Sequence, residues 1–544
     1  MNSESTLDSD AWNCPSSNVD FTSVILLSSD IHLSSSREIK MQRKALYGIL
    51  LVLTLSATLT VKPATADTLT PNDFKLKSFS KTVDFFDFAR SYAAAAGKPI
   101  PPSNWHAYLY QTYINTSGFQ LYYSGLVNIT AGTGALTIPV QSFIEHYKTP
   151  NGKDVLTSSS FIMLLAFNDT ATSKHPDSPD LNDNLYASFS LGLDLTPIYG
   201  NATKPALSSK TEIIPLTSSN NELTWTWGMR YTNLTAVWWR MWTDPANPRF
   251  EALPIAITTY DELTFTYQLD IDPNNHTATV TGNYVIGRMT NLWLIRWLFI
   301  IPVVVHYNAT GAYTPNGKTK ISNENIYQFL DKQHIKMSIV LFQNSLVLGD
   351  IKTQSSHNNQ NVTDAEVDVG NGEISTKAGN EEIFKTDFGT KATYQLYNYT
   401  ADPTETEYTE HDAVARTAPR PGYAKNPLFS IHVALLRYVP LIVQHMAPAL
   451  YQKAKEYMLN MTYADYFYLI SYPEYSGFKV KHDPTYTAYI GTTAGTAPLS
   501  GNWFGLLLIG GIIAVIAIAV ILVMKRRGAK TQTLQPPTQP TATS

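Results

Sequence analysis

The sequence predicts a mainly β protein, in which a β-sandwich ectodomain precedes a smaller α+β region and one C-terminal transmembrane helix. Between about residues 105 and 345, short strand-like segments are separated by clusters of Asn, Asp, Gly and Pro, a spacing typical of β-sandwiches and barrels. Residues 504–524 are uncharged and long enough to cross about 30 Å of hydrocarbon. Hydrophobic residues make up 44% of the chain, which is enough to fill a sizeable core.

The N-terminal part of the chain resembles a secretory signal peptide at residues 41–66. It has a basic start, an apolar run over 45–61 and a small-residue site, Ala-Thr-Ala, the three parts that such signals need. We expect cleavage before Asp67, with an uncleaved N-terminal anchor as the alternative. Residues 1–40 are polar and without pattern, so we interpret them as a doubtful N-terminal extension.

The C-terminal part of the chain predicts a single-pass membrane protein. Lys525 and two arginines follow the apolar run directly, and cytoplasmic flanks are rich in such residues. We therefore expect an extracellular ectodomain, a flexible stalk at 491–503, a transmembrane helix in membrane lipid at 504–524 and a cytoplasmic tail at 525–544.

Between the two ends, the sequence predicts three regions. Residues 67–345 form the sandwich, beginning with a helix at 83–96, and residues 346–426 are a polar loop or domain seam. Residues 427–490 supply a helical stretch and strands that pack on the ectodomain. Strand-like segments lie at 119–129, 159–167, 185–195, 223–229, 234–242, 262–270, 277–287 and 299–307.

Two further apolar runs, 291–305 and 427–449, are not expected to cross a membrane. The first is short and contains Arg296 and Pro302, and the second contains two histidines, an arginine and a proline. Both patterns indicate buried elements of a folded domain.

Composition excludes several classes of function. The formal net charge of -4 argues against nucleic-acid binding, which needs a concentrated basic surface. Cys14 is the only cysteine and precedes the expected cleavage site, so the mature chain has no thiol. Disulfides, cysteine zinc sites, iron–sulfur clusters and covalently attached haem are thereby excluded.

The chain contains ten Asn-x-Ser/Thr sequons, about twice the number expected by chance from its Asn, Ser and Thr content. Their excess supports export and N-linked glycans, and each predicts a surface position. The sequons are Asn115, Asn128, Asn168, Asn201, Asn233, Asn275, Asn308, Asn361, Asn398 and Asn460.

Five of the ten tryptophans lie between Trp225 and Trp242, in two alternating segments around a turn-like Tyr-Thr-Asn, a pattern that predicts a hairpin. One interpretation is an aromatic core. The other is a flat apolar ligand site, in which Met229 offers a thioether ligand. The indole walls of that site would be Trp225, Trp227, Trp238 and Trp239.

Three segments, 165–193, 228–242 and 302–322, resemble the haem-b domain of the ethylbenzene and dimethylsulfide dehydrogenase γ-subunits. They correspond to an acidic strand and loop, a Met-containing hairpin rich in Trp, and an Asn-Gly-x-Lys type of loop. The resemblance implies a β-sandwich with one non-covalent haem b, held by Met and Lys. Met229 matches the methionine, whereas Lys320 or Lys318 matches the lysine only with a one-residue shift.

His306, on an apolar strand upstream of that loop, is the chemically easier second ligand. Its alternative is a core histidine that is hydrogen-bonded to the backbone. A haem with protein ligands on both faces passes electrons rather than converting a substrate.

Three functions remain open at this point. Extended to archaeal cell-surface b-type cytochromes, the resemblance implies a one-electron carrier of a respiratory chain, with integral-membrane respiratory subunits or another redox protein as partners. A non-catalytic structural glycoprotein or adhesin accounts equally well for the topology and the sequons. An anchored acid hydrolase is the third, but no G-x-S-x-G, H-E-x-x-H or cysteine nucleophile is present.

Overall fold

The structure is a computed structural model that describes most of the chain between residues 76 and 491. All described residues belong to the compact unit Leu51–Ser544. They are residues 76–87, 100–116, 118–131, 134–137, 139–168, 184–189, 191–192, 209–242, 249–298, 301–347, 353–357, 360–361, 367–368, 372–397, 408–418 and 466–491, with Arg90, Ala94 and Asp177.

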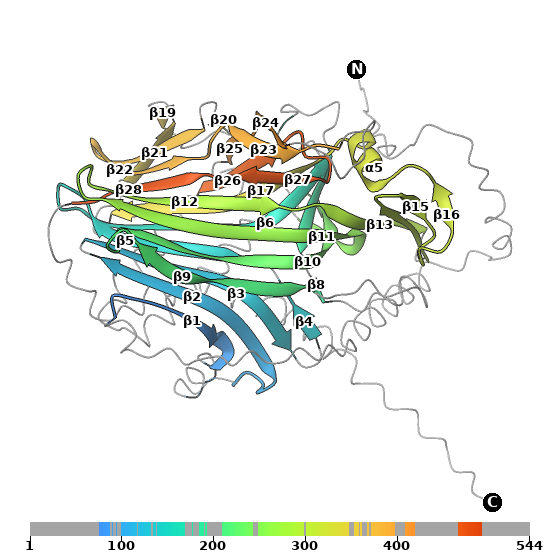
Figure 1. The fold of residues 1–544 in the computed structure, drawn as a ribbon, viewed down its shortest axis with the longest axis horizontal. Coiled ribbons are helices and arrows are strands. Elements are labelled where there is room, and N and C mark those ends of the chain that lie inside the picture. Colours follow the sequence, from blue (N-terminus) through green and yellow to red (C-terminus); the bar gives the residue numbers. More distant parts are fainter. Residues whose placement is uncertain are drawn as a thin grey trace, which may run out of the picture. The chain divides into compact units, whose positions relative to one another are not determined.

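The described part is mainly β, as predicted, and its strands form curled antiparallel sheets (Figure 1). One helix, α5 (Ile326–Lys332), carries a capping box in which the Asn325 side chain accepts a hydrogen bond from the Gln328 backbone. The expected helix at 83–96 is confirmed in part: residues 83–84 end strand β1, whereas residues 85–87, Arg90 and Ala94 are helical. None of the helices in the described part is long and apolar enough to cross a membrane.

Eight strands pair side by side in what we call the first row. In order of pairing they are β1 (Ser78–Asp84), β2 (Trp105–Thr116), β3 (Phe119–Ala131), β5 (Gln141–Lys148), β6 (Asp154–Asn168), β17 (Ile335–Val347), β26 (Tyr466–Tyr472) and β25 (Val414–Ala418). Three short strands also belong to this row: β4 (Gly134–Leu136) pairs with the end of β3, β8 (Leu191–Gly192) pairs with β4, and β20 (Val367–Asp368) pairs with β25.

A second row is built around two long strands. In order of pairing it contains β9 (Lys210–Ser219), β10 (Thr224–Trp242), β11 (Arg249–Asp272), β12 (Thr277–Ile286), β28 (Thr485–Tyr489), β22 (Glu381–Asp387), β21 (Glu373–Ala378), β18 (Thr353–His357) and β19 (Gln360–Asn361). Beside β28, β12 also pairs with β27 (Lys479–His482), followed by β23 (Lys391–Gln395) and β24 (Tyr408–Asp412).

Two further connections complete the topology. β7 (Asn184–Phe189) pairs with β6 on one side and with the end of β10 on the other, and so joins the two rows. The start of β11 pairs with β13 (Met289–Leu298), which leads to β14 (Ile301–Asn308), β15 (Gly311–Tyr313) and β16 (Lys320–Ser322).

The inner faces of the two rows contact each other through aromatic side chains. The rings of Phe161 on β6 and Phe265 on β11 are 4.4 Å apart. The hydroxyl of Tyr231 on β10 donates a hydrogen bond of 2.8 Å to the Leu126 carbonyl on β3. The core of the described part therefore lies between the rows, and burial of these large rings is its main source of stability.

The predicted hairpin at 225–242 is wrong. These residues belong to one 19-residue strand, β10, paired along its length with the 24-residue β11. The turn-like Tyr-Thr-Asn lies inside this strand: Thr232 pairs with Glu262 and Leu234 with Tyr260, so the register continues unchanged past Asn233, which has a φ of 50°. Asn tolerates such a positive φ, which explains why this local irregularity resembles a turn in the sequence.

The predicted polar loop at 346–426 also differs from the structure, because the eight strands from β18 to β25 lie there. In β21, Ile374, Thr376 and Ala378 are buried and alternate with half-buried residues. The polar residues between them hide the period of two that identifies a strand.

Some of the remaining predicted regions lie within the described residues. The strand-like sequences after residue 465 form β26, β27 and β28, as predicted, and pair with the two rows. The apolar run 291–305 forms β13 and β14 rather than a membrane span. Several predicted features lie outside the described residues: the N-terminal extension, the signal peptide, the helical stretch at 427–460, the stalk, the transmembrane helix and the tail.

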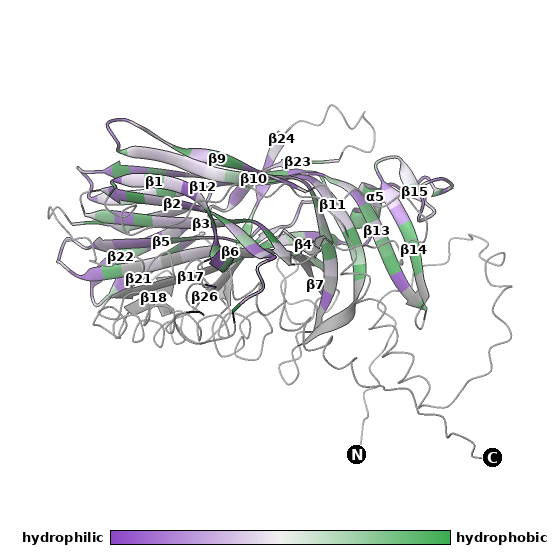
Figure 2. Ribbon diagram, turned by 90° about the horizontal axis from the view of Figure 1, so that it is seen from below, coloured by the Kyte–Doolittle hydropathy of each residue, from purple (hydrophilic) through white to green (hydrophobic). Residues whose placement is uncertain are grey.

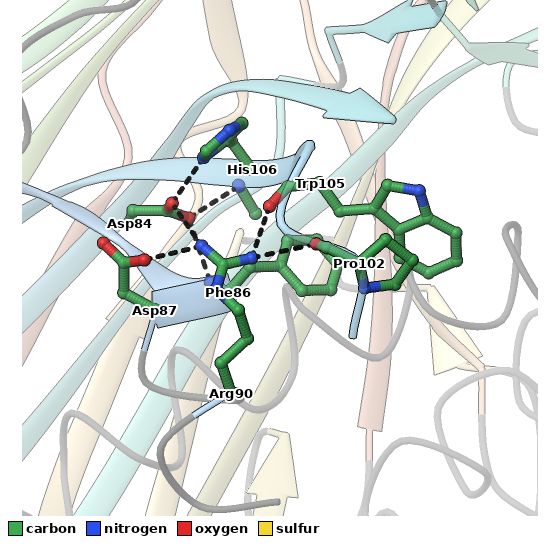
Figure 3. A network of polar contacts seen from close by, with 8 residues as sticks. Asp84, Phe86, Asp87, Arg90, Pro102, Trp105 and His106 are labelled. Carbon is green, nitrogen blue, oxygen red and sulfur yellow. Dashed lines mark hydrogen bonds and ion pairs between the residues drawn. The ribbon is translucent and has the colours of Figure 1, made fainter. Parts of the chain in front are cut away.

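A buried carboxylate fixes the first strand to the second (Figure 3). Asp84, 6% exposed, accepts hydrogen bonds from the backbone N–H groups of Phe86 and Ala107, at 2.9 and 3.0 Å. Its other oxygen lies 2.8 Å from Nδ1 of His106 and 3.4 Å from the guanidinium of Arg90. A carboxylate with so many donors stabilises the end of β1 against β2.

We predict that Asp84→Ala lowers the free energy of unfolding by about 3 kcal/mol, because it leaves buried N–H groups without an acceptor. Asp87→Ala is the matched control. Asp87 also pairs with Arg90, at 2.5 Å, but its side chain is 63% exposed, so its loss should change stability by about 0.5 kcal/mol or less. Denaturant unfolding measures both; equal losses would contradict the assignment.

Candidate functional site

The inward face of β10 carries the residues that the sequence analysis singled out. Trp225, Trp227, Met229 and Tyr231 alternate along the strand and are all buried between the two rows. Their spacing of two residues places them on one face of β10, as the strand geometry requires. Trp225, Trp227 and Met229, three residues of the predicted ligand site, therefore share one face of β10.

Met229 is fully buried, and its sulfur lies directly on the backbone of β3. A Cβ atom added to Gly125 would lie 2.1 Å from the sulfur, closer than any real contact. The Tyr231 hydroxyl is 3.9 Å from the same sulfur. The space around the thioether is therefore occupied by protein, and Gly125 is the residue whose missing side chain admits it.

Aromatic rings surround this contact. Trp227 stacks on Tyr267 at 5.7 Å, and Tyr123 lies 5.4 Å from Tyr267. The hydroxyls of Tyr123 and Tyr267 both donate to Oε1 of Gln141, at 2.9 and 3.0 Å. Burial raises the pKa of both tyrosines well above the ordinary value, so both remain neutral donors.

The two later tryptophans of the predicted site, Trp238 and Trp239, lie beyond Asn233 on β10. Trp238 is 3% exposed, and its ring stacks on Tyr186 of β7 at 6.3 Å. Trp239 is opposite Pro254 on β11 and Ala187 on β7, and only its backbone is among the described parts of the structure. Trp238 therefore packs where β7 joins the rows, not beside Met229.

His306 lies on β14, in a different part of the sheet. Its ring stacks on Trp293 at 4.6 Å, and Nε2 is 2.9 Å from the Asn291 side-chain oxygen. Burial lowers its pKa to about 4, so the ring is neutral at ordinary pH. Nδ1 is buried without a hydrogen-bond partner in the described structure, and Gly317 lies close to it.

Lys318 and Lys320 lie in the loop and strand that follow β14, and both are exposed. Tyr313, which pairs with His306, also pairs with Lys320. A lysine that binds a metal must be neutral, which requires a buried apolar setting. The exposed positions of these two lysines do not provide one.

The register of the strands separates Met229 from His306 and the lysines. Met229 pairs with Phe265 on β11, whereas His306 reaches β11 through Trp293 and Ile257. Phe265 and Ile257 are eight residues apart on β11, about 26 Å of extended strand.

The predicted ligand set therefore does not fit one haem as arranged. Two axial ligands must lie on opposite sides of one iron atom, and neither a Met/Lys nor a Met/His pair does so here. Among the described residues, no three His, Cys, Asp or Glu side chains are grouped to hold a metal ion.

The described sequons occupy different environments. Asn275, in the β11–β12 turn, and Asn233, the residue of β10 with a positive φ, are exposed. Asn115, Asn128, Asn168 and Asn308 are half-buried; Nδ2 of Asn168 donates to the Gln333 carbonyl. Only the backbone of Asn361 is described, and three sequons lie outside the described residues: Asn201, Asn398 and Asn460.

Glu145 on β5 is a buried acid that the sequence analysis did not select. It is fully buried, and one oxygen accepts a 2.6 Å hydrogen bond from Thr157. The other oxygen has no hydrogen-bond partner in the described structure. Burial raises its pKa to about 8. The lone acid between the apolar residues of QSFIEHYK was the available signal.

Comparison with known proteins gives no relative: no family model, no curated protein and no solved structure matches the chain.

We predict that Gly125→Ala destabilises the protein by about 1–3 kcal/mol, because its methyl group meets the Met229 sulfur. Met229→Ala alone should cost about 2–5 kcal/mol through the cavity it leaves. In the double variant the new methyl group enters that cavity, so the combined loss should be smaller than the sum of the two. Additive losses in denaturant unfolding would contradict a direct contact.

We also predict a pH effect of Glu145. Its pKa is raised on folding, from 4.5 to about 8, so the folded state holds this proton more tightly than the unfolded state. The stabilisation is complete below pH 4.5 and is lost as the pH rises to 8, by about 1.4 kcal/mol per pH unit. Glu145→Gln removes this titration. The difference in unfolding free energy between wild type and variant should follow that slope; a difference that is constant over this window contradicts it.

Proposed function

We propose that the chain is a non-catalytic cell-surface glycoprotein whose all-β ectodomain has a structural or adhesive role. The observation that carries the proposal is the closed interior at Met229. Protein fills the space around the sulfur, and the other expected ligands, His306 and the two lysines, lie elsewhere on the sheet. The aromatic-core interpretation of the Trp-rich strand is the one that the contacts favour.

The arrangement of the two rows supports a β-sandwich as the finer description of this ectodomain. Their inner faces meet through rings such as Phe161 and Phe265, and residues on these faces alternate with outward ones. A fold with a well-packed aromatic core suits a rigid surface module, because burial of aromatic side chains stabilises it without disulfides.

The sequence features at the two ends support an exported, anchored location. A signal peptide at 41–66 and a span at 504–524 would place the ectodomain outside the cell membrane. The exposure of Asn233 and Asn275 leaves room for glycans at these sequons.

The second candidate is an extracellular b-type cytochrome that transfers single electrons in an archaeal respiratory chain. The resemblance to haem-b domains favours it, as does the overall similarity in architecture to the glycosylated haem protein of archaeal cytochrome b-558/566. In the structure, the neutral His306 ring with an unpartnered Nδ1 is the feature closest to an available ligand. A haem there would need a ligand other than Met229.

Absorption spectra separate the two candidates. Protein purified from a host that makes haem should show no Soret band and no sharp bands after reduction, because no ligand pair converges on one iron. A His306→Ala variant serves as the control. A Soret band that His306→Ala alters would favour the cytochrome and overturn the structural proposal.

Glycan mapping tests the surface role independently. We predict occupied sites at the exposed Asn233 and Asn275, and no glycan at Asn168, whose Nδ2 is hydrogen-bonded to a backbone carbonyl. Mass spectrometry of glycopeptides from the native host measures the occupancy of each. Bare asparagine at both exposed sequons would argue against a surface glycoprotein.

A further inference from the structure

The core between the two rows is rich in tyrosine. Eight of the nine largest fully buried side chains in the described part are tyrosines. Along β1, β2 and β3, hydrophobic residues alternate with hydrophilic or intermediate ones rather than forming continuous runs (Figure 2). A buried phenol needs a hydrogen-bond partner, and the chemistry of that partner decides whether the phenolic proton can move.

One of these tyrosines, Tyr472 on β26, has a histidine as its partner. Its hydroxyl lies 3.2 Å from Nδ1 of His482 on β27, and the two ring centroids are 5.6 Å apart. Neither residue is more than 2% exposed. The contact connects the first row with the second, because β26 pairs with β17 and β27 pairs with β12.

His482 is placed to accept the phenolic proton of Tyr472. Burial lowers the pKa of His482 to about 4, so the ring is neutral and Nδ1 can present its lone pair to the phenol. Nε2 faces the backbone of Gly389 without a hydrogen-bond partner in the described structure. The backbone of Phe388 and Gly389 nevertheless favours the protonated ring and offsets part of the effect of burial. An imidazolium formed here is therefore partly stabilised.

The tyrosines around Met229 differ from Tyr472 in the atom that accepts their hydrogen bond. Tyr123 and Tyr267 donate to the side-chain oxygen of Gln141, and Tyr231 donates to a backbone carbonyl. An amide oxygen accepts a hydrogen bond but is not a base that takes the proton. Because a phenol that loses an electron becomes a strong acid, oxidation is easiest where a base lies within hydrogen-bond distance. Compared with these three tyrosines, Tyr472 meets that condition.

Aromatic rings connect Tyr472 with the surface. The ring of Tyr394 lies 6.3 Å from that of Tyr472, and the half-buried ring of His411 lies 5.7 Å from Tyr394. The Tyr394 hydroxyl donates a hydrogen bond of 2.6 Å to the backbone carbonyl of Asp412, an exposed residue. One ring therefore separates Tyr472 from the exposed strand β24.

A second series of rings extends from His482 into the core. Tyr284 is opposite His482 in the pairing of β12 with β27. Its ring lies 6.1 Å from that of Tyr267, which stacks on Trp227 at 5.7 Å. Neighbouring rings at these distances allow an electron to pass from Tyr472 to an oxidised Trp227.

We propose that Tyr472 and His482 form a redox-active pair that supplies an electron when a peroxyl radical oxidises the protein. Tyr472 loses one electron, its O–H bond breaks, and an N–H bond forms at Nδ1 of His482. The products are a neutral phenoxyl radical and an imidazolium. The peroxyl radical gains the electron and a proton from water, and becomes a hydroperoxide.

A thiol in solution reverses the change at the protein. It gives one electron to the phenoxyl radical and releases its own proton to water, while the proton on His482 returns to the oxygen of Tyr472. This protective activity goes beyond the proposed surface role, and it needs neither a haem nor a metal.

Electron paramagnetic resonance of the full chain tests the proposal. A ruthenium tris-bipyridine complex, flashed with light in the presence of persulfate, oxidises the protein by one electron, and samples are frozen at increasing times. Tyr472→Phe keeps the ring and removes the hydroxyl, and His482→Gln keeps a hydrogen-bonding side chain without the base. The matched control is Tyr123→Phe, which removes another fully buried hydroxyl, bonded to an amide.

Wild type and Tyr123→Phe should show a tyrosyl signal that persists after radicals at the surface have combined. Tyr472→Phe and His482→Gln should both lose this persistent signal. With a chemical source of peroxyl radicals, mass spectrometry should find more oxidised Trp227 in Tyr472→Phe than in Tyr123→Phe. The proposal is overturned by the absence of a persistent signal in wild type, by a signal that is equal in all four proteins, or by equal oxidation of Trp227 in the two tyrosine variants.

Discussion

The antiparallel pairing of β10 with β11 is the constraint on which the rest of the described fold depends. β11 is long enough to pair with β12 at one end and β13 at the other, while β10 pairs with β9 and with β7, which joins the two rows. The pair also sets the core, because Trp227 and Met229 face inward from it. A shift of one residue in register would turn those side chains outward, so burial of the aromatic face fixes the register.

Much of the strand content can be predicted from the sequence, but the length of β10 cannot. Alternating apolar residues identify both halves of this strand, and Asn233, which has a positive φ, then looks like the turn between them. Only the pairing with an unbroken β11, which lies later in the chain, makes the two halves one strand. The strands at 346–426 are not predicted for another reason. Hydroxyl and amide residues are so frequent in them that the alternation of apolar and polar residues, which identifies a strand, is not visible in the sequence.

The candidate site is predictable in its composition and unpredictable in its arrangement. The sequence identifies Met229 as a thioether among tryptophans, and His306 as a histidine on an apolar strand. It cannot show that Gly125, some hundred residues earlier, receives the sulfur, or that His306 reaches β11 far from Met229. Both facts depend on pairings between distant segments. A resemblance that rests on short motifs identifies the same candidate residues, but it does not show whether they are close together in the fold.

The central claim is that protein, rather than a cofactor, surrounds the Met229 sulfur, and NMR of the full chain with 13C-labelled methionine methyl groups tests it most directly. Met229→Leu assigns the resonance. The account predicts a Met229 methyl signal within the diamagnetic range, shifted by the rings of Trp227 and its neighbours and unchanged by oxidation or reduction. A signal that moves or broadens when the redox state changes would place the sulfur on a redox-active iron and contradict the account.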